Sequence, residues 1–121
     1  ELFINASPKT GMEDGHLIVR NSILMHNYQG ITCQSGCLIQ GNVISFHTYS
    51  AIIIGQSGSL VIDNMISNNG GYGVTGNYVG LSNNTLFNNE YCHTSGVMLV
   101  GTRNMIYPES SGTFCAALPG N

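Results

Sequence analysis

Aliphatic side chains and asparagines recur along this chain at a nearly constant spacing. An Asn followed two residues later by an aliphatic residue occurs at Asn21, Asn42, Asn64, Asn84 and Asn104. Successive members of this series lie 20 to 22 residues apart. A fixed period of this length is typical of a solenoid in which each repeat forms one coil. The pattern predicts about five coils of 20–22 residues, over residues 16–107.

Two further columns of residues accompany the asparagines. Three residues before the Asn stand Ile18, Ile39, Val61 and Leu81. About nine residues after it, a small residue precedes a β-branched one in Gly30-Ile31, Ala51-Ile52, Gly73-Val74 and, after three extra residues, Gly96-Val97. Short apolar runs separated by Gly, Asn and Ser are typical of strands joined by turns. The pattern predicts an all-β chain with three short strands per coil.

Stacked coils would place equivalent side chains above one another. We expect a core ladder made of Ile23, Ile44, Ile66, Leu86 and Ile106. Burying one such side chain contributes roughly 1.5–3 kcal/mol. The Asn column falls at a turn, where a side-chain amide can bond its own turn and the next coil. Residues 1–15 and 108–121 are then end caps or cut edges of the coil stack.

The leucine-rich repeat is the competing solenoid, because its signature shares the aliphatic and Asn positions. That signature also requires leucines five and eight residues before the Asn. Those positions here include His16, Gln56 and Ser59. The parallel β-helix is therefore the better interpretation.

The order Gly-Ile, then an aliphatic residue, then Asn-x-Ile resembles the parallel β-helix repeat of the pectin-lyase-like superfamily. The resemblance covers about residues 16–107. It implies a right-handed coil and extracellular work on polysaccharide, as in pectate lyases, polysaccharide epimerases and phage tailspikes. The superfamily also includes non-catalytic, fibrocystin-like cell-surface proteins. Because the repeat encodes the coil and not the chemistry, it indicates fold strongly and function weakly.

Composition removes several classes of function. Only 7 % of residues are charged, the net charge is −3, and the basic residues are Lys9, Arg20 and Arg103. Such a chain lacks the electrostatic footprint of a nucleic-acid partner, and its apolar runs are too short for membrane insertion. Cys33 and Cys37 could form a bridge across a short turn or stay as buried thiols. We expect no cofactor and no metal, because His26 and His47 fall short of a ligand set.

The candidate binding site is an outward edge of the coils. Five residues after the Asn stand His26, His47, Asn69 and Asn89. Seven residues after it stand Tyr28, Tyr49, Gly71 and Tyr91, with Tyr72 beside the gap. Tyrosine rings beside amide and imidazole groups suit sugar rings and hydroxyls. The alternative is that these tyrosines only stack on one another beside solvated turn residues.

Candidate catalytic residues are sparse. Asp63 and Glu90 are weak candidates, and neither belongs to an obvious acid pair of the kind that glycoside hydrolysis needs. Asp63 stands in a column with Arg20, Gly41, Asn83 and Arg103, which indicates charge compensation. The motifs of pectate lyases and polygalacturonases are not present in the sequence. The three extra residues predict a protruding loop at residues 90–95, where function could be carried.

Apolar residues also fall at positions that the repeat turns outward. They are Leu24, Val43, Met65, Phe87, Met98 and Tyr107. Exposed apolar surface usually marks contact with a partner. We expect further β-helix coils of a larger protein or a homo-oligomer, for example a trimer, to cover it.

The sequence as a whole favours a non-catalytic, extracellular-type β-helix segment that recognises glycan or supports adhesion. It would act outside the cell, at a cell surface or on a virion. Two alternatives stay open. One is a fragment of a polysaccharide-degrading enzyme, such as a lyase, hydrolase or phage tailspike depolymerase, and the other is a structural spacer.

Overall fold

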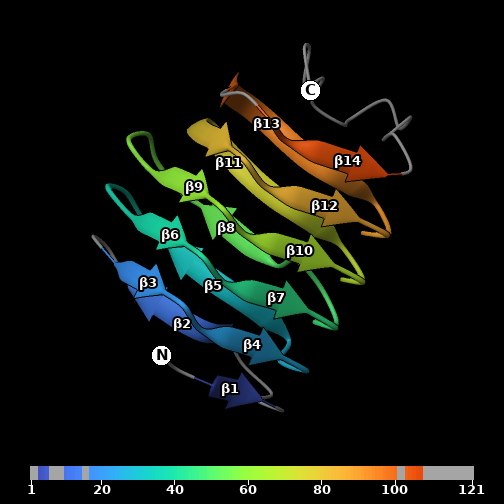
Figure 1. Cartoon of the computed structure of the whole chain (residues 1–121). Helices are drawn as coiled ribbons and strands as arrows, with labels where there is room; N and C mark the ends of the chain where they lie inside the picture. The colour runs from blue at the N-terminus through green and yellow to red at the C-terminus, as the bar shows by residue number, and fades with distance from the viewer. Residues whose placement is uncertain (1–2, 6–9, 15–16, 101–102, 108–121) are drawn as a thin grey trace.

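The computed structural model describes residues 3–5, 10–14, 17–100 and 103–107. These residues form fourteen strands and no helix, stacked as successive coils along one axis (Figure 1). The strands are β1 (Phe3–Asn5), β2 (Thr10–Asp14), β3 (Ile18–Arg20), β4 (Ile23–Met25), β5 (Gln29–Cys33), β6 (Leu38–Gln40), β7 (Val43–Ser45), β8 (Ile52–Ile54), β9 (Leu60–Ile62), β10 (Met65–Ser67), β11 (Tyr72–Ser82), β12 (Thr85–Phe87), β13 (Cys92–Val100) and β14 (Met105–Tyr107).

Parallel pairing of these strands gives the coil three faces. The first sheet has the order β1-β4-β7-β10-β12-β14. A second face contains β2, β5, β8 and the start of β11, and a third face contains β3, β6, β9 and the end of β11. β11 runs through both faces and joins them into one bent sheet, and β13 pairs along β11. The predicted parallel β-helix is confirmed, and its second and third strands fuse in the later coils.

Strand register confirms the predicted coil length. In the first sheet, Ile23 pairs with Val43, Val43 with Met65, and Met65 with Thr85. These partners are 20, 22 and 20 residues apart. Part of the N-terminal segment continues the stack, because β1 pairs with β4 and β2 pairs with β5. The segment 108–121 lies outside the described residues.

The core consists of aliphatic ladders from all three faces. The fully buried members are Leu24, Ile44, Ile66 and Leu86 in the first sheet, Ile31, Ile52 and Val74 in the second face, and Ile39, Val61 and Leu81 in the third. Neighbouring side chains in a strand alternate between its two sides, so most three-residue strands bury their middle residue, whereas β8 buries Ile52 and Ile54. Successive coils therefore cover one another's aliphatic groups.

The first coil lies one residue away from its predicted register. Ile18 is 66 % exposed, whereas Val19 is 3 % exposed and pairs with Ile39. Leu24 is fully buried and stacks on Ile44, while Ile23 is half-buried. The predictions that Ile18 and Ile23 point inward and that Leu24 points outward are therefore wrong. A one-residue shift exchanges the buried and the exposed side of a strand.

The segment 90–95 does not form the predicted protruding loop. Thr94 pairs with Val74, and Gly96 pairs with Gly76, so residues from Cys92 onward continue as strand β13. His93 takes the column position that Gly73 has in the preceding coil, and Gly96-Val97 does not. The irregularity lies instead at Tyr78 in β11, between Asn77 and Val79, where the register shifts.

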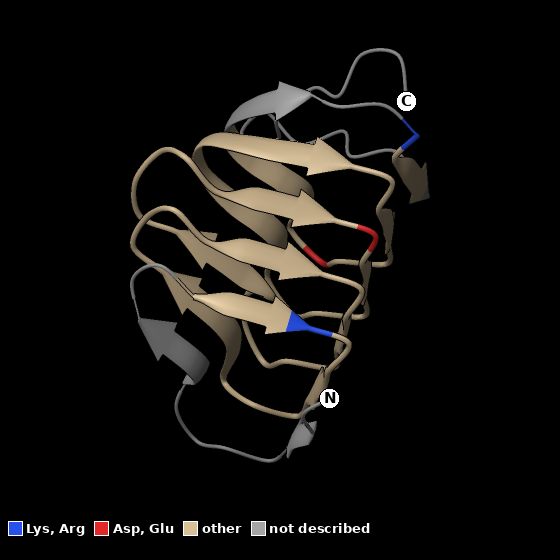
Figure 2. Ribbon diagram, turned by 60° about the vertical axis from the view of Figure 1, so that its left-hand side comes forward, with Lys and Arg blue, Asp and Glu red and all other residues tan. Residues whose placement is uncertain are grey.

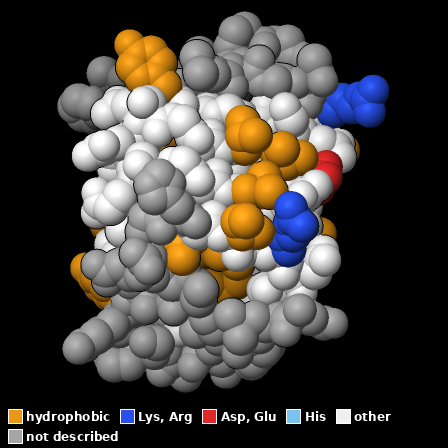
Figure 3. Space-filling model, turned by 90° about the vertical axis from the view of Figure 1, so that its left-hand side faces the viewer, with side chains coloured by type: hydrophobic (Ala, Val, Ile, Leu, Met, Phe, Trp, Pro, Cys, Tyr) orange, Lys and Arg blue, Asp and Glu red, His pale blue; other side chains and the backbone are white. Residues whose placement is uncertain are grey.

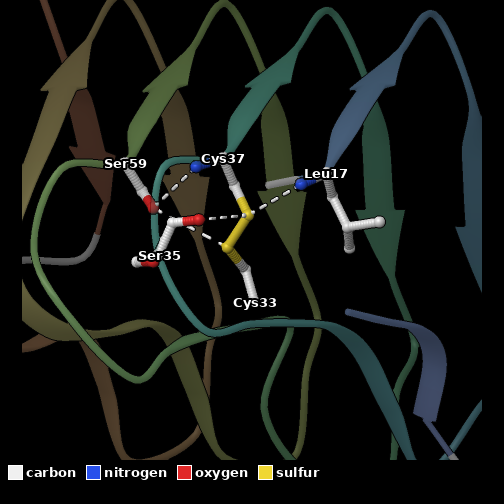
Figure 4. The surroundings of a disulfide bond; sticks show 5 residues. All are labelled: Leu17, Cys33, Ser35, Cys37 and Ser59. Carbon is white, nitrogen blue, oxygen red and sulfur yellow. Dashed lines mark hydrogen bonds between the residues drawn. A yellow bond between two sulfur atoms is a disulfide. The ribbon is translucent and has the colours of Figure 1, made fainter. Parts of the chain in front are cut away.

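A disulfide closes the turn between β5 and β6. Cys33 and Cys37 are both buried and bonded to each other (Figure 4). The backbone N–H of Leu17 donates to Cys37 Sγ over 3.2 Å, and that of Cys37 donates to Ser59 Oγ over 3.1 Å. Cys92 is disulfide-bonded as well. Of the two alternatives for Cys33 and Cys37, the structure shows the bridge.

Candidate functional site

The corner between the first sheet and the second face carries three columns of side chains. An outer column consists of His26, Phe46, Asn68 and Asn88. An inner column consists of the next residues, Asn27, His47, Asn69 and Asn89. A tyrosine edge, which we define as Tyr28, Tyr49, Tyr72 and Tyr91, lies where the second face begins.

The outer column turns the chain through a left-handed backbone conformation. Its four residues have φ between 55° and 58°. His26 and Phe46 stack with their ring centroids 5.5 Å apart, and Asn88 Nδ2 donates to Asn68 Oδ1 over 2.7 Å. Short polar side chains tolerate this conformation better than bulky ones do. His26, Phe46 and Asn88 are exposed to solvent, and Asn68 is half-buried.

The inner column points into the molecule. His47 and Asn69 are each 2 % exposed, and Asn89 is 8 % exposed. Asn69 Nδ2 donates to the Ile44 carbonyl and to Asn89 Oδ1, which accepts over 2.9 Å. The prediction that His47, Asn69 and Asn89 form an outward stripe with His26 is therefore wrong. In the first coil the same step from the Asn ends at exposed His26, because that coil is shifted by one residue.

His47 is held in the inner column by its backbone and its ring. Its backbone N–H donates to Asn69 Oδ1 over 3.1 Å, and its Nδ1 accepts from the N–H of Asn27 over 3.2 Å. Nε2 is buried without a hydrogen-bond partner. It faces Gly30, where an added Cβ would lie 3.0 Å from it. Burial lowers the pKa of His47 from 6.5 to about 4.

The tyrosine edge is a continuous row of rings. Tyr28 and Tyr49 stack with centroids 6.0 Å apart, and Tyr72 contacts Tyr49 and Tyr91 edge-on at 6.5 and 5.7 Å. Tyr28 is 48 % exposed and Tyr91 is 57 % exposed. The column predicted from the sequence had a gap at Gly71. Tyr49 and Tyr91 contact each other across that gap with centroids 6.4 Å apart, and the ring of Tyr72 packs against both.

A shallow open groove lies beside the tyrosine edge. Its volume is about 660 Å³, and its lining consists of Phe46, Asn68, Asn69, Gly70, Asn88, Asn89 and Glu90. Glu90 is exposed and directly precedes Tyr91. No tyrosine lines the groove itself, but Glu90 lines it and is followed by Tyr91, so the groove and the tyrosine edge adjoin and form one surface. Phe46, Asn68, Asn88 and Tyr72 belong to this surface although they were not predicted as binding residues.

The two candidate acids lie apart. Asp63 precedes β10 and Glu90 follows β12, so the two acids lie at opposite ends of the parallel strands of the first sheet. Asp63 Oδ1 accepts from Asn83 Nδ2 over 2.6 Å, and its Oδ2 accepts from Gln40 Nε2 over 3.4 Å. Arg20 does not stand in the Asp63 column, because it ends β3 and Asn21 takes the turn position. Figure 2 shows how few charged residues the described coils carry.

The asparagine ladder lies where the strands of the first sheet begin, at the end opposite to the outer column. Asn42, Asn64 and Asn84 each donate from Nδ2 to Oδ1 of the next Asn over 3.0 or 3.1 Å. Each Nδ2 also donates to the carbonyl of an aliphatic core residue. Ser22, and not Asn21, occupies the ladder in the first coil, because the N–H of Ser22 donates to Asn42 Oδ1 over 3.0 Å. The prediction for Asn21 is wrong, and those for Asn42, Asn64, Asn84 and Asn104 are confirmed.

Exposed aliphatic side chains gather on the third face. Ile18 pairs with Leu38, and Leu38 pairs with Leu60. Ile18 and Leu60 are 66 % and 49 % exposed, and Figure 3 shows hydrophobic side chains grouped on this side of the molecule. Met65 and Phe87 are exposed on the first sheet as predicted, whereas Val43 is half-buried. The side chains of Met98 and Tyr107 lie outside the described ones.

Comparisons with known proteins place this fold in a family. The model of a family described as "Periplasmic copper-binding protein (NosD)" matches residues 9–116. Comparison with curated proteins and with solved structures gave no match. None of the described segments is an apolar helix of membrane-spanning length. The matched range includes every described strand except β1, and so this parallel β-helix chain belongs to the NosD family.

Proposed function

We propose that this chain is a non-catalytic glycan-recognition module that works outside the cytoplasm. In this proposal a sugar chain lies on the tyrosine edge and in the groove beside it. The observation that carries the proposal is the row of four contacting tyrosine rings, two of which are about half exposed. Tyrosine combines an apolar ring face with a hydroxyl, and sugars present the same two kinds of surface.

The coil repeat supports a linear ligand. Adjacent parallel strands are about 4.8 Å apart, so the backbone advances by that distance with each coil, while the contacting tyrosine rings lie 5.7 to 6.5 Å apart between centroids. This step is comparable with the length of one sugar unit in an extended polysaccharide. A glycan chain running along the coil axis could therefore place successive sugars on successive coils. The Asn68 and Asn88 amides beside the rings offer both donors and acceptors for hydroxyl groups.

Binding without cleavage is favoured by the positions of the acids. Glycoside hydrolysis uses two carboxyl groups that flank one bond. Asp63 and Glu90 lie at opposite ends of the strands of the first sheet, so they cannot flank the same glycosidic bond. The hydrolase alternative therefore requires acids other than this pair, for example from further coils or subunits.

Two observations support a location outside the cytoplasm. Cys33 and Cys37 are joined in a disulfide, and Cys92 is disulfide-bonded. Structural disulfides form and persist in oxidising compartments. The family to which the chain belongs is described as periplasmic. Attachment to a cell or virion surface stays a prediction.

Copper, which the family description names, does not fit the described residues. Copper is held in proteins chiefly by His, Cys and Met side chains. The described part of the chain gathers no group of three or more His, Cys, Asp or Glu residues. Cys33 and Cys37 are bonded to each other, and His47 has Nδ1 engaged and Nε2 facing Gly30 in the core. The proposed function accordingly includes no step that uses copper.

The test is a glycan-array screen followed by titration calorimetry on the sugars that bind. The variant Tyr28→Ala/Tyr91→Ala removes the two most exposed rings of the edge and should weaken binding at least tenfold, because ring–sugar contacts are lost. Tyr78→Ala is the matched control, since Tyr78 is 54 % exposed but lies in the β11 bulge away from the edge.

The binding results of the three proteins decide whether the proposal holds. Binding by the parent chain and by Tyr78→Ala that is lost or at least tenfold weaker in Tyr28→Ala/Tyr91→Ala, with intact sugars recovered, would support it. Equal binding by all three proteins would contradict it, and so would the recovery of cleaved sugars. Circular dichroism of each variant checks that a loss of binding does not come from unfolding.

A further inference from the structure

The groove is lined by one acidic side chain and by no Lys or Arg. Glu90 is the single carboxylate that lines the groove, and it is exposed. The described arginines stand elsewhere. Arg20 ends β3 and Arg103 precedes β14, so both lie where the strands of the first sheet begin, at the end away from the groove. His26 also belongs to the outer column, but it lies two coils away from Asn68, and its ring stacks on Phe46 in the coil between them. Amides and one negative charge therefore dominate the groove.

We infer that this groove selects uncharged sugars and rejects acidic ones, with Glu90 as the specificity-determining residue. The inference rests on the proposed function, because it concerns which glycan the tyrosine edge holds. Nothing in the family match assigns such a preference.

The chemistry of the lining explains the selection. The Glu90 carboxylate can accept a hydrogen bond from a sugar hydroxyl, and the Asn88 side chain offers an amide to hydroxyl or acetamido groups. A uronate would bring a second carboxylate toward Glu90, and no described Lys or Arg at this edge would compensate it. Like charges at an exposed site repel modestly and are screened by salt. The discrimination should therefore be moderate and dependent on salt.

The size of the effect follows from the exposure of Glu90. Single interactions between exposed charges change affinity by at most roughly fivefold. Only the sugar that sits beside Glu90 experiences the repulsion directly. The inference thus predicts that a galacturonate oligomer binds roughly two- to fivefold more weakly than a neutral oligomer of equal length.

The experiment compares hexamers of glucose and of N-acetylglucosamine, which are neutral, with the hexamer of galacturonate. Titration calorimetry at low salt measures each sugar against the parent chain, Glu90→Gln and Asp63→Asn. Glu90→Gln should strengthen galacturonate binding roughly two- to fivefold and change neutral-sugar binding by less than about twofold. Asp63→Asn makes the same change of charge at the opposite edge and should alter neither.

The outcomes separate this inference from the proposed function. Tyrosine-dependent binding in which galacturonate equals the neutral hexamers would overturn the selectivity and leave the proposed function standing. An equal gain from Asp63→Asn would show a general charge effect and would also overturn the role of Glu90. Binding of galacturonate but of neither neutral hexamer would also overturn the selectivity, whereas the proposed function itself would fall only if the folded parent bound no glycan of the array. Loss of the neutral–acidic difference at high salt, together with the Glu90→Gln gain, would support the inference.

Discussion

Single buried asparagine side chains connect neighbouring coils of this protein by hydrogen bonds. Asn64 Oδ1 accepts from the N–H and from Nδ2 of Asn42, and Asn64 Nδ2 donates to the Ile39 carbonyl and to Asn84 Oδ1. One buried amide therefore satisfies groups of three coils. Turns this short leave buried backbone groups that only such a side chain can reach.

Replacing Asn64 should be costly because its neighbours would lose their partners. We expect Asn64→Ala to lower the free energy of unfolding by about 3 kcal/mol, since two buried donors of Asn42 are left unpaired. Urea denaturation measures this change. Asn21→Gly is the control: Asn21 is exposed with φ of 48°, so the change should cost less than about 1 kcal/mol. Equal losses would show that Asn21 belongs to the ladder after all.

His47 makes the stability of the fold depend on pH. The folded protein keeps this ring neutral, because burial lowers its pKa from 6.5 to about 4. As pH falls through 6.5, the unfolded chain takes up a proton that the folded chain does not, so stability is lost from there down to about pH 4. The loss between pH 7 and pH 5 should be about 2 kcal/mol.

Urea denaturation at the two pH values checks this expectation. His47→Asn copies Asn69 and Asn89 of the same column and should remove most of the pH dependence. His26→Asn is the matched control, because His26 is exposed and its loss should leave the pH dependence as it is. An unchanged pH dependence in His47→Asn would mean that another group titrates.

At the scale of elements, the corners rather than the strands decide which residues are presented. Seven three-residue strands, β3, β4, β6, β7, β9, β10 and β12, bury their middle residue, and each of them is followed by one residue with positive φ. At the outer column this residue is His26, Phe46, Asn68 or Asn88. Because these corners stack, one residue type can be compared with another in the same surroundings.

Phe46 is the least suited residue of the outer column. A bulky side chain in the left-handed region carries strain of order 1 kcal/mol or more, whereas Asn adopts that region readily. We expect Phe46→Asn to raise the midpoint of thermal unfolding slightly, with a gain of about 0.5–1 kcal/mol that is reduced by the lost stacking on His26. Asn68→Phe should do the reverse. A loss of stability in Phe46→Asn would show that the ring contact outweighs the strain.

The whole molecule is a one-dimensional stack, so its stability depends on contacts between neighbouring coils. Ile44 is fully buried between coils that carry Leu24 and Ile66, whereas Ile106 is half-buried in β14 at the edge of the first sheet. An interior coil therefore has neighbours on both sides along the ladder.

Truncating one aliphatic group at two places in the stack tests this arrangement. Ile44→Ala should lower the free energy of unfolding by about 3–4 kcal/mol, and Ile106→Ala by about half as much, because its side chain is less buried. Chemical denaturation of both variants measures the difference. Equal losses would show that position in the stack does not matter. The predicted covering of Met65 and Phe87 by further coils or a second copy stays a prediction.

The sequence by itself determined the repeat, its length of 20–22 residues, the parallel β-helix and the columns of tyrosines and asparagines. Stacked coils demand similar residues at similar positions, so this information is written in the spacing. Only the tertiary structure decided whether Asn21 or Ser22 enters the ladder, that His47 and Asn69 point inward, and that Tyr72 packs against Tyr49 and Tyr91. Neighbouring residues of a strand face opposite sides, and a left-handed corner residue shifts that alternation, so the contact with the next coil selects the register.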